Sequence, residues 1–246
     1  NDPLVDLAAA LIRAHSPSGR EGPATRVLMD AFCDHGFDEA RVDEVGNAIG
    51  VFRRGDGPTL MLCGHLDTVP LGAEERWPHP PLSGVVEGGR LWGRGACDMK
   101  GALASMVFAA ADAAASGFRG TLIVSGVVQE EVGGLGARHL GATLDYDAVV
   151  LGEPSKLRLM LGHRGCTVVE VVFPGAIAHA AKASLGENAL THAGRYLVAL
   201  EDLELPSDPV FGGSSATPTR LTSLPSDSSN VVPGEARLTV DYRSLP

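Results

Sequence analysis

A histidine and an aspartate two residues apart follow a short apolar run, Thr59–Cys63. The run has the composition of a strand that is buried on both faces of a sheet, and Gly64 ends it. His65 and Asp67 then follow at the spacing that points two side chains of a strand the same way. A ligating imidazole usually donates its other N–H to an acceptor, so this pair suits a metal ligand and its orienting partner. A strand-end turn with two solvated polar groups is the alternative that this stretch leaves open.

Acidic residues occur at the ends of further apolar runs and ahead of a helix. They are Glu130 and Glu131 after the run Thr121–Val128, Glu153 after Ala148–Leu151, and Asp98 before a helix predicted at about 102–116. In open α/β sheets, sites form where the carboxyl ends of the strands meet. A histidine, an aspartate able to bridge and two glutamates that converge there favour a metal site with oxygen and nitrogen ligands. Solvated loop acids are the alternative for any one of these residues.

The segments before these residues have the patterns of helices and a hairpin. Pro3–Ala14 carries apolar residues on one helical face and is predicted to be an amphipathic helix. Glu21–His35 is predicted to be a second helix. Two β-rich stretches, Val42–Val45 and Ala48–Phe52, flank Gly46-Asn47, which is typical of a two-residue hairpin turn. With the buried strands, these elements predict an α/β domain with a mixed, largely parallel sheet.

The pattern changes after Arg164-Gly165. The expected elements are a half-exposed strand at Cys166–Phe173, a helix at about 188–203, and β-like segments near Pro218–Leu224 and Glu235–Arg243. The order β-α-β-β predicts a small two-layer α+β domain with an open-faced antiparallel sheet. We therefore expect two domains, residues 1–163 and 164–246.

The composition allows a large packed core and argues against some classes of binding partner. Of the 246 residues, 44% are hydrophobic, and 20 Lys and Arg against 30 Asp and Glu give a formal charge of −10. This balance argues against binding to nucleic acid or to anionic membrane. No apolar run is long enough to span a bilayer. The four scattered cysteines form no Cys-x-x-Cys pair, so we expect free thiols and a cytoplasmic location.

Four motifs in sequence order carry a resemblance to a known family. They are Gly64-His65-Leu66-Asp67-Thr68-Val69, Gly93-Arg94-Gly95 with Asp98-Met99-Lys100-Gly101, Glu130-Glu131, and Gly152-Glu153-Pro154. Together they closely resemble the di-zinc metallopeptidases that include acetylornithine deacetylase, succinyl-diaminopimelate desuccinylase, aminoacylase and glutamate carboxypeptidase. The resemblance covers essentially the whole chain.

The resemblance implies a role for each residue of the predicted site. His65, Asp98 and Glu153 would hold one zinc ion, Asp98 would bridge to a second zinc bound by Glu131, Glu130 would be the general base, and Asp67 would orient His65. The implied enzyme is a zinc-dependent hydrolase that cleaves an amide bond through a hydroxide held between the metals, with Co²⁺ able to replace Zn²⁺. Its substrate would be a small N-acyl amino acid, or a peptide cut beside a free carboxylate as by a carboxypeptidase.

The second domain resembles the family's ferredoxin-like lid, which commonly mediates dimerisation. By this resemblance His179 would reach the active site of the partner in a homodimer and stabilise the oxyanion. Asn230 and Arg243 would bind the substrate carboxylate. Ala183 stands where relatives usually have proline, so the loop that carries His179 is expected to be set differently.

The resemblance also implies a metal ligand that is not found in this sequence. Relatives complete the second zinc site with a histidine after the lid, whereas this sequence stops at Pro246, inside the lid. We therefore expect a fragment of a longer protein, which holds one zinc ion better than the second. Two alternatives stay open: an aminopeptidase with the same metal centre and, for this piece, a non-catalytic module for metal binding or dimerisation.

Overall fold

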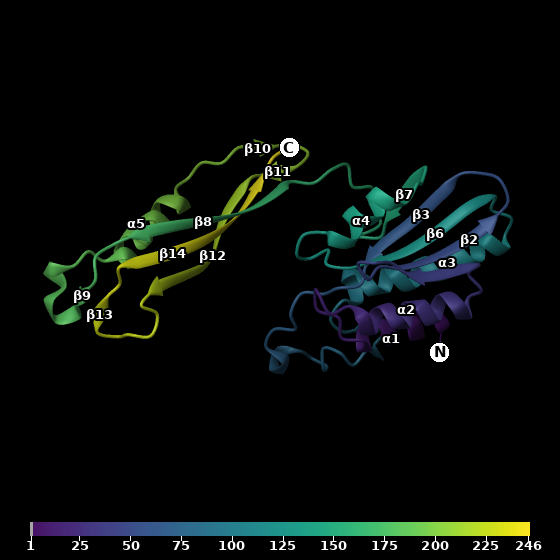
Figure 1. Ribbon diagram of the computed structural model, residues 1–246, viewed down its shortest axis with the longest axis horizontal. Helices are drawn as coiled ribbons and strands as arrows, with labels where there is room; N and C mark the ends of the chain where they lie inside the picture. The colour runs from purple at the N-terminus through teal and green to yellow at the C-terminus, as the bar shows by residue number, and fades with distance from the viewer. Residues whose placement is uncertain (1) are drawn as a thin grey trace. The chain divides into compact units, whose positions relative to one another are not determined.

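The computed structural model describes residues 2–246, which belong to two compact units. The first unit runs to Leu157 and the second is Arg158–Pro246 (Figure 1). The expected division into a catalytic domain, 1–163, and a lid, 164–246, concerns the roles of these parts and stays a prediction.

A mixed five-stranded sheet forms the centre of the first unit. Its strands lie in the order β1-β2-β6-β3-β7, with the bounds β1 Glu39–Val42, β2 Ala48–Arg54, β6 Gly120–Val127, β3 Thr59–His65 and β7 Ala148–Leu151. Strand β3 is parallel to both β6 and β7, whereas β2 is antiparallel to β1 and β6. The three strands that end in predicted site residues are therefore parallel neighbours, as predicted, and their carboxyl ends meet at one edge of the sheet.

Helices cover both faces of this sheet (Figure 1). The helices α1 Pro3–Arg13, α2 Gly22–Asp34 and α3 Gly101–Ala115 contribute to one apolar core, and α4 Leu135–Thr143 contributes to the other. Strand β2 serves both cores, because its side chains alternate between the faces. Ala48 and Phe52 belong to the core with α1, α2 and α3, whereas Ile49 and Val51 belong to the core with α4.

Helix α1 begins and ends close to the predicted positions, for reasons that the sequence carries. The Asp2 side chain accepts a hydrogen bond from the Leu4 N–H, and Pro3 stands at the first helical position, where its missing N–H costs nothing. Leu11 and Ile12 are fully buried. Helices α2 and α3 also lie where they were predicted, within a few residues at each end.

The connection between β1 and β2 differs from the predicted two-residue turn. Val42 pairs with Ala48, so residues 43–47 all belong to the connection and the first strand lies earlier than expected. Asp43 explains the difference, because its Oδ1 accepts hydrogen bonds from the N–H groups of Val45, Gly46 and Asn47 at 3.1, 3.0 and 2.9 Å. A side chain that satisfies three backbone donors makes a longer turn stable.

Some elements of the first unit had no clear signal in the sequence. The hairpin of β4 Val85–Glu87 and β5 Arg90–Trp92 lies in the long loop before Asp98, and α4 follows Glu131. An irregular helical turn, Ala96–Lys100, leads into α3 and is interrupted by non-helical backbone at Asp98.

The second unit is a three-stranded antiparallel sheet with one long helix against it. The strands lie in the order β12-β14-β8, with the bounds β12 Ser215–Leu224, β14 Glu235–Ser244 and β8 Gly165–Pro174. Helix α5, Ala189–Glu201, buries Ala189 and Ala193 against Ala236 of β14. This arrangement has the predicted β-α-β-β order.

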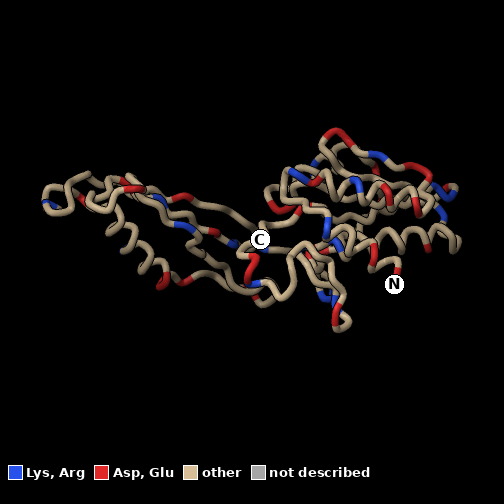
Figure 2. Tube along the Cα trace, turned by 90° about the horizontal axis from the view of Figure 1, so that it is seen from below, with Lys and Arg blue, Asp and Glu red and all other residues tan. Residues whose placement is uncertain are grey.

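Two short strand pairs complete the second unit. They are β9 Ala178–His179 with β13 Val231–Val232, and β10 Ser207–Asp208 with β11 Gly212–Gly213. Acidic and basic residues are interspersed along both units (Figure 2). Across residues 2–246, every helix is too short or too polar to cross a membrane.

Candidate metal centre

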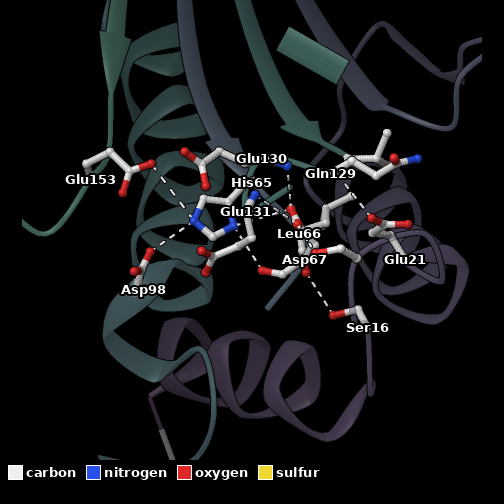
Figure 3. A network of polar contacts seen from close by, with 12 residues as sticks. Ser16, Glu21, His65, Leu66, Asp67, Asp98, Gln129, Glu130, Glu131 and Glu153 are labelled. Carbon is white, nitrogen blue, oxygen red and sulfur yellow. Dashed lines mark hydrogen bonds and ion pairs between the residues drawn. The ribbon is translucent and has the colours of Figure 1, made fainter. Parts of the chain in front are cut away.

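His65 is the last residue of β3, and its side chain is only 1% exposed. Its Nε2 lies 2.9 Å from Asp98 Oδ1 and 3.9 Å from Glu153 Oε1 (Figure 3). Its Nδ1 lies 2.9 Å from the backbone oxygen of Asp67. A carbonyl oxygen can only accept, so this contact places a proton on Nδ1 and leaves Nε2 to face the carboxylates.

The acidic residues around His65 come from the ends of the parallel strands and from the start of α3. Glu153 follows β7, Glu130 and Glu131 follow β6, and Asp98 precedes α3. Ligand atoms of His65, Asp98 and Glu153 all lie within 4.8 Å of one another, and the same holds for His65, Glu130 and Glu131. The fold thus brings together the base and the four ligands that the resemblance implied within this sequence; the further histidine that it implied is not among these residues.

A buried methionine packs against the glycines that precede two of these residues. Met99 directly follows Asp98 and is 1% exposed. A Cβ atom added to Gly64 would lie 2.4 Å from Met99 Cε, and one added to Gly152 would lie 2.9 Å from it. These glycines directly precede His65 and Glu153, so the lack of a side chain lets both strand ends approach the methionine.

Asp67 contacts more than the histidine it was expected to orient. Its fully buried carboxylate accepts hydrogen bonds from Ser18 Oγ at 2.7 Å, from the Glu130 N–H at 3.0 Å and from the Glu131 N–H at 3.2 Å. The distance from His65 Nδ1 to Asp67 Oδ1 is longer, at 3.6 Å. Asp67 therefore connects the end of β3 to the segment that carries Glu130 and Glu131.

The electrostatic surroundings shift the pKa values of this pair in opposite directions. Burial by itself lowers the pKa of His65, but hydrogen bonds with Asp67 and Asp98 and the charge of Glu153 outweigh burial and raise it to about 9. Burial by itself raises the pKa of Asp67, but hydrogen bonds from His65, Ser18 and the backbone lower it to about 2. Both groups are therefore held in their charged forms at neutral pH when no metal is bound.

The remaining carboxylates show that negative charge is in excess. Burial, followed by the charges of neighbouring acids, raises the pKa of Glu131 and of Glu153. Lys100 is buried nearby, but its Nζ donates to the Ala14 backbone oxygen at 2.9 Å, and burial lowers its pKa to about 8. A cation bound between the carboxylates would relieve this repulsion.

In the second unit, the structure places His179 next to Asn230. His179 in β9 pairs with Val231 in β13, and the Ala180 N–H donates to the Asn230 backbone oxygen at 2.8 Å. Both side chains are exposed. The His179 Nδ1 accepts a hydrogen bond from the Ala181 N–H at 3.1 Å, and Asn230 Oδ1 accepts one from Ser228 Oγ at 2.9 Å.

Arg243 lies apart from these two residues within the second unit. It stands near the end of β14, whereas Asn230 precedes the beginning of that strand. At roughly 3.4 Å per residue, a strand of this length separates its ends by more than 20 Å. The Arg243 guanidinium already pairs with Asp241, through Nε at 2.7 Å and Nη2 at 3.1 Å. One copy of the chain therefore does not bring Arg243 and Asn230 to the same carboxylate.

Several residues of this network had no signal in the sequence. Ser18, Glu21 and Asn47 hold the site through hydrogen bonds across long stretches of the chain. Serine, glutamate and asparagine are common in surface turns, so the residue types give no indication of a role. What distinguishes these three residues is that their hydrogen-bond partners lie far away in the sequence. A single sequence carries no information about such pairs.

The arrangement of parallel strands, histidine and carboxylates suits a metal site in an α/β fold, and comparisons with known proteins identify the family. The sequence model of Peptidase family M20/M25/M40 matches residues 61–235. Since this match covers more than half of the chain, the chain belongs to that family of hydrolytic enzymes.

Two curated relatives and one solved structure illustrate the similarity. The "Putative LysW-lysine/LysW-ornithine hydrolase" of Thermococcus kodakarensis is 37% identical over 169 residues, which cover 68% of this chain and 44% of that protein. The succinyl-diaminopimelate desuccinylase of Alkalilimnicola ehrlichii is 34% identical over 259 residues, which cover 97% of this chain and 68% of that protein. The M20 family metallo-carboxypeptidase Sso-CP2 of Sulfolobus solfataricus shares the fold with a TM-score of 0.76, at 17% identity, over 100% of this chain and 72% of that one.

Proposed function

We propose that this chain carries the zinc site and the general base of a hydrolase that cleaves an amide bond beside a free carboxylate. The substrate would be an N-acyl amino acid or the last peptide bond of a small peptide. One observation carries the proposal: a buried histidine faces carboxylates from the ends of two parallel strands and the start of a helix. The names of the two relatives, a hydrolase and a desuccinylase, support it.

The donor set fits zinc. Imidazole nitrogen and carboxylate oxygen are ordinary zinc ligands, whereas Mg²⁺ and Ca²⁺ prefer oxygen alone. His65, Asp98 and Glu153 would hold one ion, and Asp98 with Glu131 would hold a second. The hydrogen bond from His65 Nδ1 to the Asp67 backbone oxygen supports this assignment, because it leaves Nε2 free to ligate. When bound, the zinc pair would supply Lewis-acid polarisation of the amide carbonyl and would acidify water.

Glu130 is the proposed general base, and it lies beside these ligands without being needed as one. Its carboxylate takes a proton from the attacking water as the oxygen–carbon bond forms. It then gives that proton to the amine nitrogen as the carbon–nitrogen bond breaks, so the products are a carboxylic acid and an amine, and the acid passes its proton to the amine or to solvent at neutral pH. Such transfers are typically worth about 10²–10⁴-fold in rate.

The second unit would contribute substrate recognition and a homodimer contact. His179, Asn230 and Arg243 are exposed, which supports a role in binding groups from outside the chain. We assign His179 to the oxyanion of a partner's site. We assign Asn230 and Arg243 to the substrate carboxylate, with the two residues supplied by different copies of the chain in the homodimer. These roles rest on the family resemblance and on the exposure of the side chains.

Metal removal and substrate choice test the proposal together. The chain is dialysed against a chelator, assayed by release of free amino acid from N-acyl amino acids, and assayed again after addition of Zn²⁺, Co²⁺ or Mg²⁺. We expect activity to be lost and then restored by Zn²⁺ or Co²⁺ only. Full activity in the chelated chain would disprove metal dependence. Hydrolysis of amino-acid amides in preference to N-acyl amino acids would instead identify an aminopeptidase.

A further inference from the structure

The segment Val128–Glu131, which follows β6, is held by side chains rather than by strand pairing. Its consecutive backbone N–H groups donate to Asn47 Oδ1 at 3.0 Å, Glu21 Oε1 at 3.1 Å, Asp67 Oδ1 at 3.0 Å and Asp67 Oδ2 at 3.2 Å. Figure 3 shows the contacts of Glu21 and Asp67. Because the segment ends in Glu130 and Glu131, these acceptors fix the backbone of the proposed base and of a proposed ligand.

The acceptors are buried and distant in sequence. Asn47 and Asp67 are fully buried and Glu21 is 5% exposed. Glu21 lies 108 residues from Gln129, and no basic side chain within residues 2–246 lies at ion-pair distance from it. Its Oε1 instead accepts from two backbone donors, the N–H groups of Gly19 at 2.8 Å and of Gln129. A buried carboxyl group with so few partners is costly, and the contacts it makes show what it does there.

The side chain of Glu21 does not cap the helix that it precedes. It stands at the N-cap position of α2, but its side chain makes no capping hydrogen bond to that helix. The hydrogen-bonded cap that an acidic residue often provides at a helix start is therefore absent, and the side chain reaches across to Gln129 instead.

Gln129 has a backbone conformation that needs support. Its φ is 55°, in the left-handed region that residues other than glycine seldom adopt. Such a conformation persists where the surroundings over-determine it. Here the N–H of Gln129 is held by Glu21, and its carbonyl oxygen accepts from the Gly134 N–H at 2.7 Å. Since Gln129 directly precedes Glu130, its backbone angles set the direction in which Glu130 leaves the sheet.

We propose that Glu21 is a positioning residue for Glu130, acting through the backbone of Gln129. The essential feature is the position of one oxygen atom, Oε1, which holds Gln129 in its left-handed conformation and so directs the base toward His65. This proposal rests on the proposed function, because it matters for rate only if Glu130 acts as the base. It concerns a residue that neither ligates nor touches the reacting groups.

Three substitutions of Glu21 distinguish the effect of the position of Oε1 from the effect of the carboxylate charge. Glu21→Gln removes the charge but keeps an oxygen at the Oε1 position, whereas Glu21→Asp keeps the charge but withdraws the oxygen by one methylene group. Glu21→Ala removes both. We expect kcat for an N-acyl amino acid to fall about 10–100-fold in the Asp and Ala variants, with KM within about twofold of the parent, since a small misplacement of a catalytic group has effects of that size. The Gln variant should stay within about threefold, and the exposed control Glu75→Gln should match the parent.

Amide hydrogen exchange provides a readout that does not need activity. The segment 128–131 should exchange at least tenfold faster in Glu21→Asp and Glu21→Ala, with α2 and β2 unchanged and the zinc content preserved. If neither the parent nor any variant hydrolyses an amide, the proposed function fails. Hydrogen exchange then still tests whether Glu21 holds the backbone of Gln129. Two outcomes overturn the positioning role: an Asp variant with parental kcat and exchange, or a Gln variant as damaged as the Asp variant. If Glu21→Ala does not fold, the Asp and Gln variants decide the question.

Discussion

The candidate residues of the two units are held in different ways. In the first unit, His65 is bonded to Asp98, 33 residues away, and Asp67 is bonded to the N–H groups of Glu130 and Glu131, 63 and 64 residues away. In the second unit, the side-chain contacts of His179, Asn230 and Arg243 reach only two residues along the chain. The side chains of the first unit are therefore positioned by contacts between distant parts of the chain. The side chains of the second unit are positioned by contacts within their own loop or strand.

This difference indicates which steps each unit can support. Groups that act on the reacting bond gain from fixed geometry, because the cost of ordering them is met during folding. Exposed groups with local partners suit recognition, in which the incoming molecule completes the site. Changes in the first unit should therefore reduce turnover, and changes in the second should mainly alter binding.

The largest effect should come from Glu130. Glu130→Gln keeps the size of the side chain and its backbone contact with Asp67, but it removes the base. We expect kcat to fall about 10²–10⁴-fold while the zinc content is unchanged, as measured by steady-state kinetics and elemental analysis. Glu131→Gln is the matched control, and it should lower zinc content instead. Parental zinc content and parental kcat in both variants would contradict the assignment of Glu130 as the base and Glu131 as a ligand.

His179 tests whether an exposed residue of the second unit also acts on the reaction. His179→Asn keeps a side chain able to accept from the Ala181 N–H, so the local turn should survive. If the imidazole donates to an oxyanion, kcat should fall about 10²-fold with little change in KM. Mixing this variant with the Glu130→Gln variant should restore part of the activity, since a mixed dimer of the two variants would contain one site with both residues intact. No recovery on mixing would argue against a contribution from the partner.

Arg243 should affect binding alone. Arg243→Ala is expected to raise KM for an N-acyl amino acid about tenfold, because a charge-assisted contact to the substrate carboxylate is lost. Asp241→Ala should lower KM, since Asp241 competes for the same guanidinium. Arg237 is a control on the same strand, since its Nε pairs with Glu235 two residues away as Arg243 pairs with Asp241, and it also pairs with Glu170. An equal change in KM from Arg237→Ala would indicate a general charge effect.

The smallest effect concerns the stability of the chelated chain. The pKa of His65 is raised from 6.5 to about 9, so its protonated form stabilises the fold fully below pH 6.5 and this contribution is lost as pH rises through 9. The melting temperature should therefore fall by a few degrees between pH 6.5 and 8 relative to a His65→Asn variant. Taking the difference from the variant removes the contribution of the other titrating groups to the pH dependence of the melting temperature. Equal pH dependence in both proteins would show that the charge of His65 is not stabilised.

Much of the first unit could be predicted from local patterns. The run Thr59–Cys63 is apolar because β3 is covered on both faces, and Pro3–Ala14 has the periodicity of a helix with one buried face. The acids at strand ends predicted a common site, because parallel strands deliver their carboxyl ends to one edge. The distinct roles of Glu130 and Glu131 came from the family resemblance, since adjacency in sequence does not separate a base from a ligand.

The parts that escaped prediction depend on contacts between distant residues. Asp43 lengthens the β1–β2 turn through its side chain, which overrides the hairpin signal of Gly46-Asn47. The sequence pattern places Glu21 at the start of a helix, and nothing near it in sequence indicates that its carboxyl group reaches Gln129. The order β-α-β-β of the second unit was predictable, whereas the pairing of Arg243 with Asp241 was not.

The packing of Met99 bears on which ion the site accepts. Its buried methyl group lies against the glycines that precede His65 and Glu153, and Met99 directly follows Asp98, so we expect this packing to limit how far the three proposed ligands can spread apart. Ca²⁺ takes oxygen ligands at about 2.3–2.6 Å, whereas zinc takes nitrogen and oxygen ligands at about 2.0–2.2 Å. A frame that resists expansion discriminates between ions by radius. If the proposed ligands hold zinc, this methionine would help to exclude the larger ion without being a ligand itself.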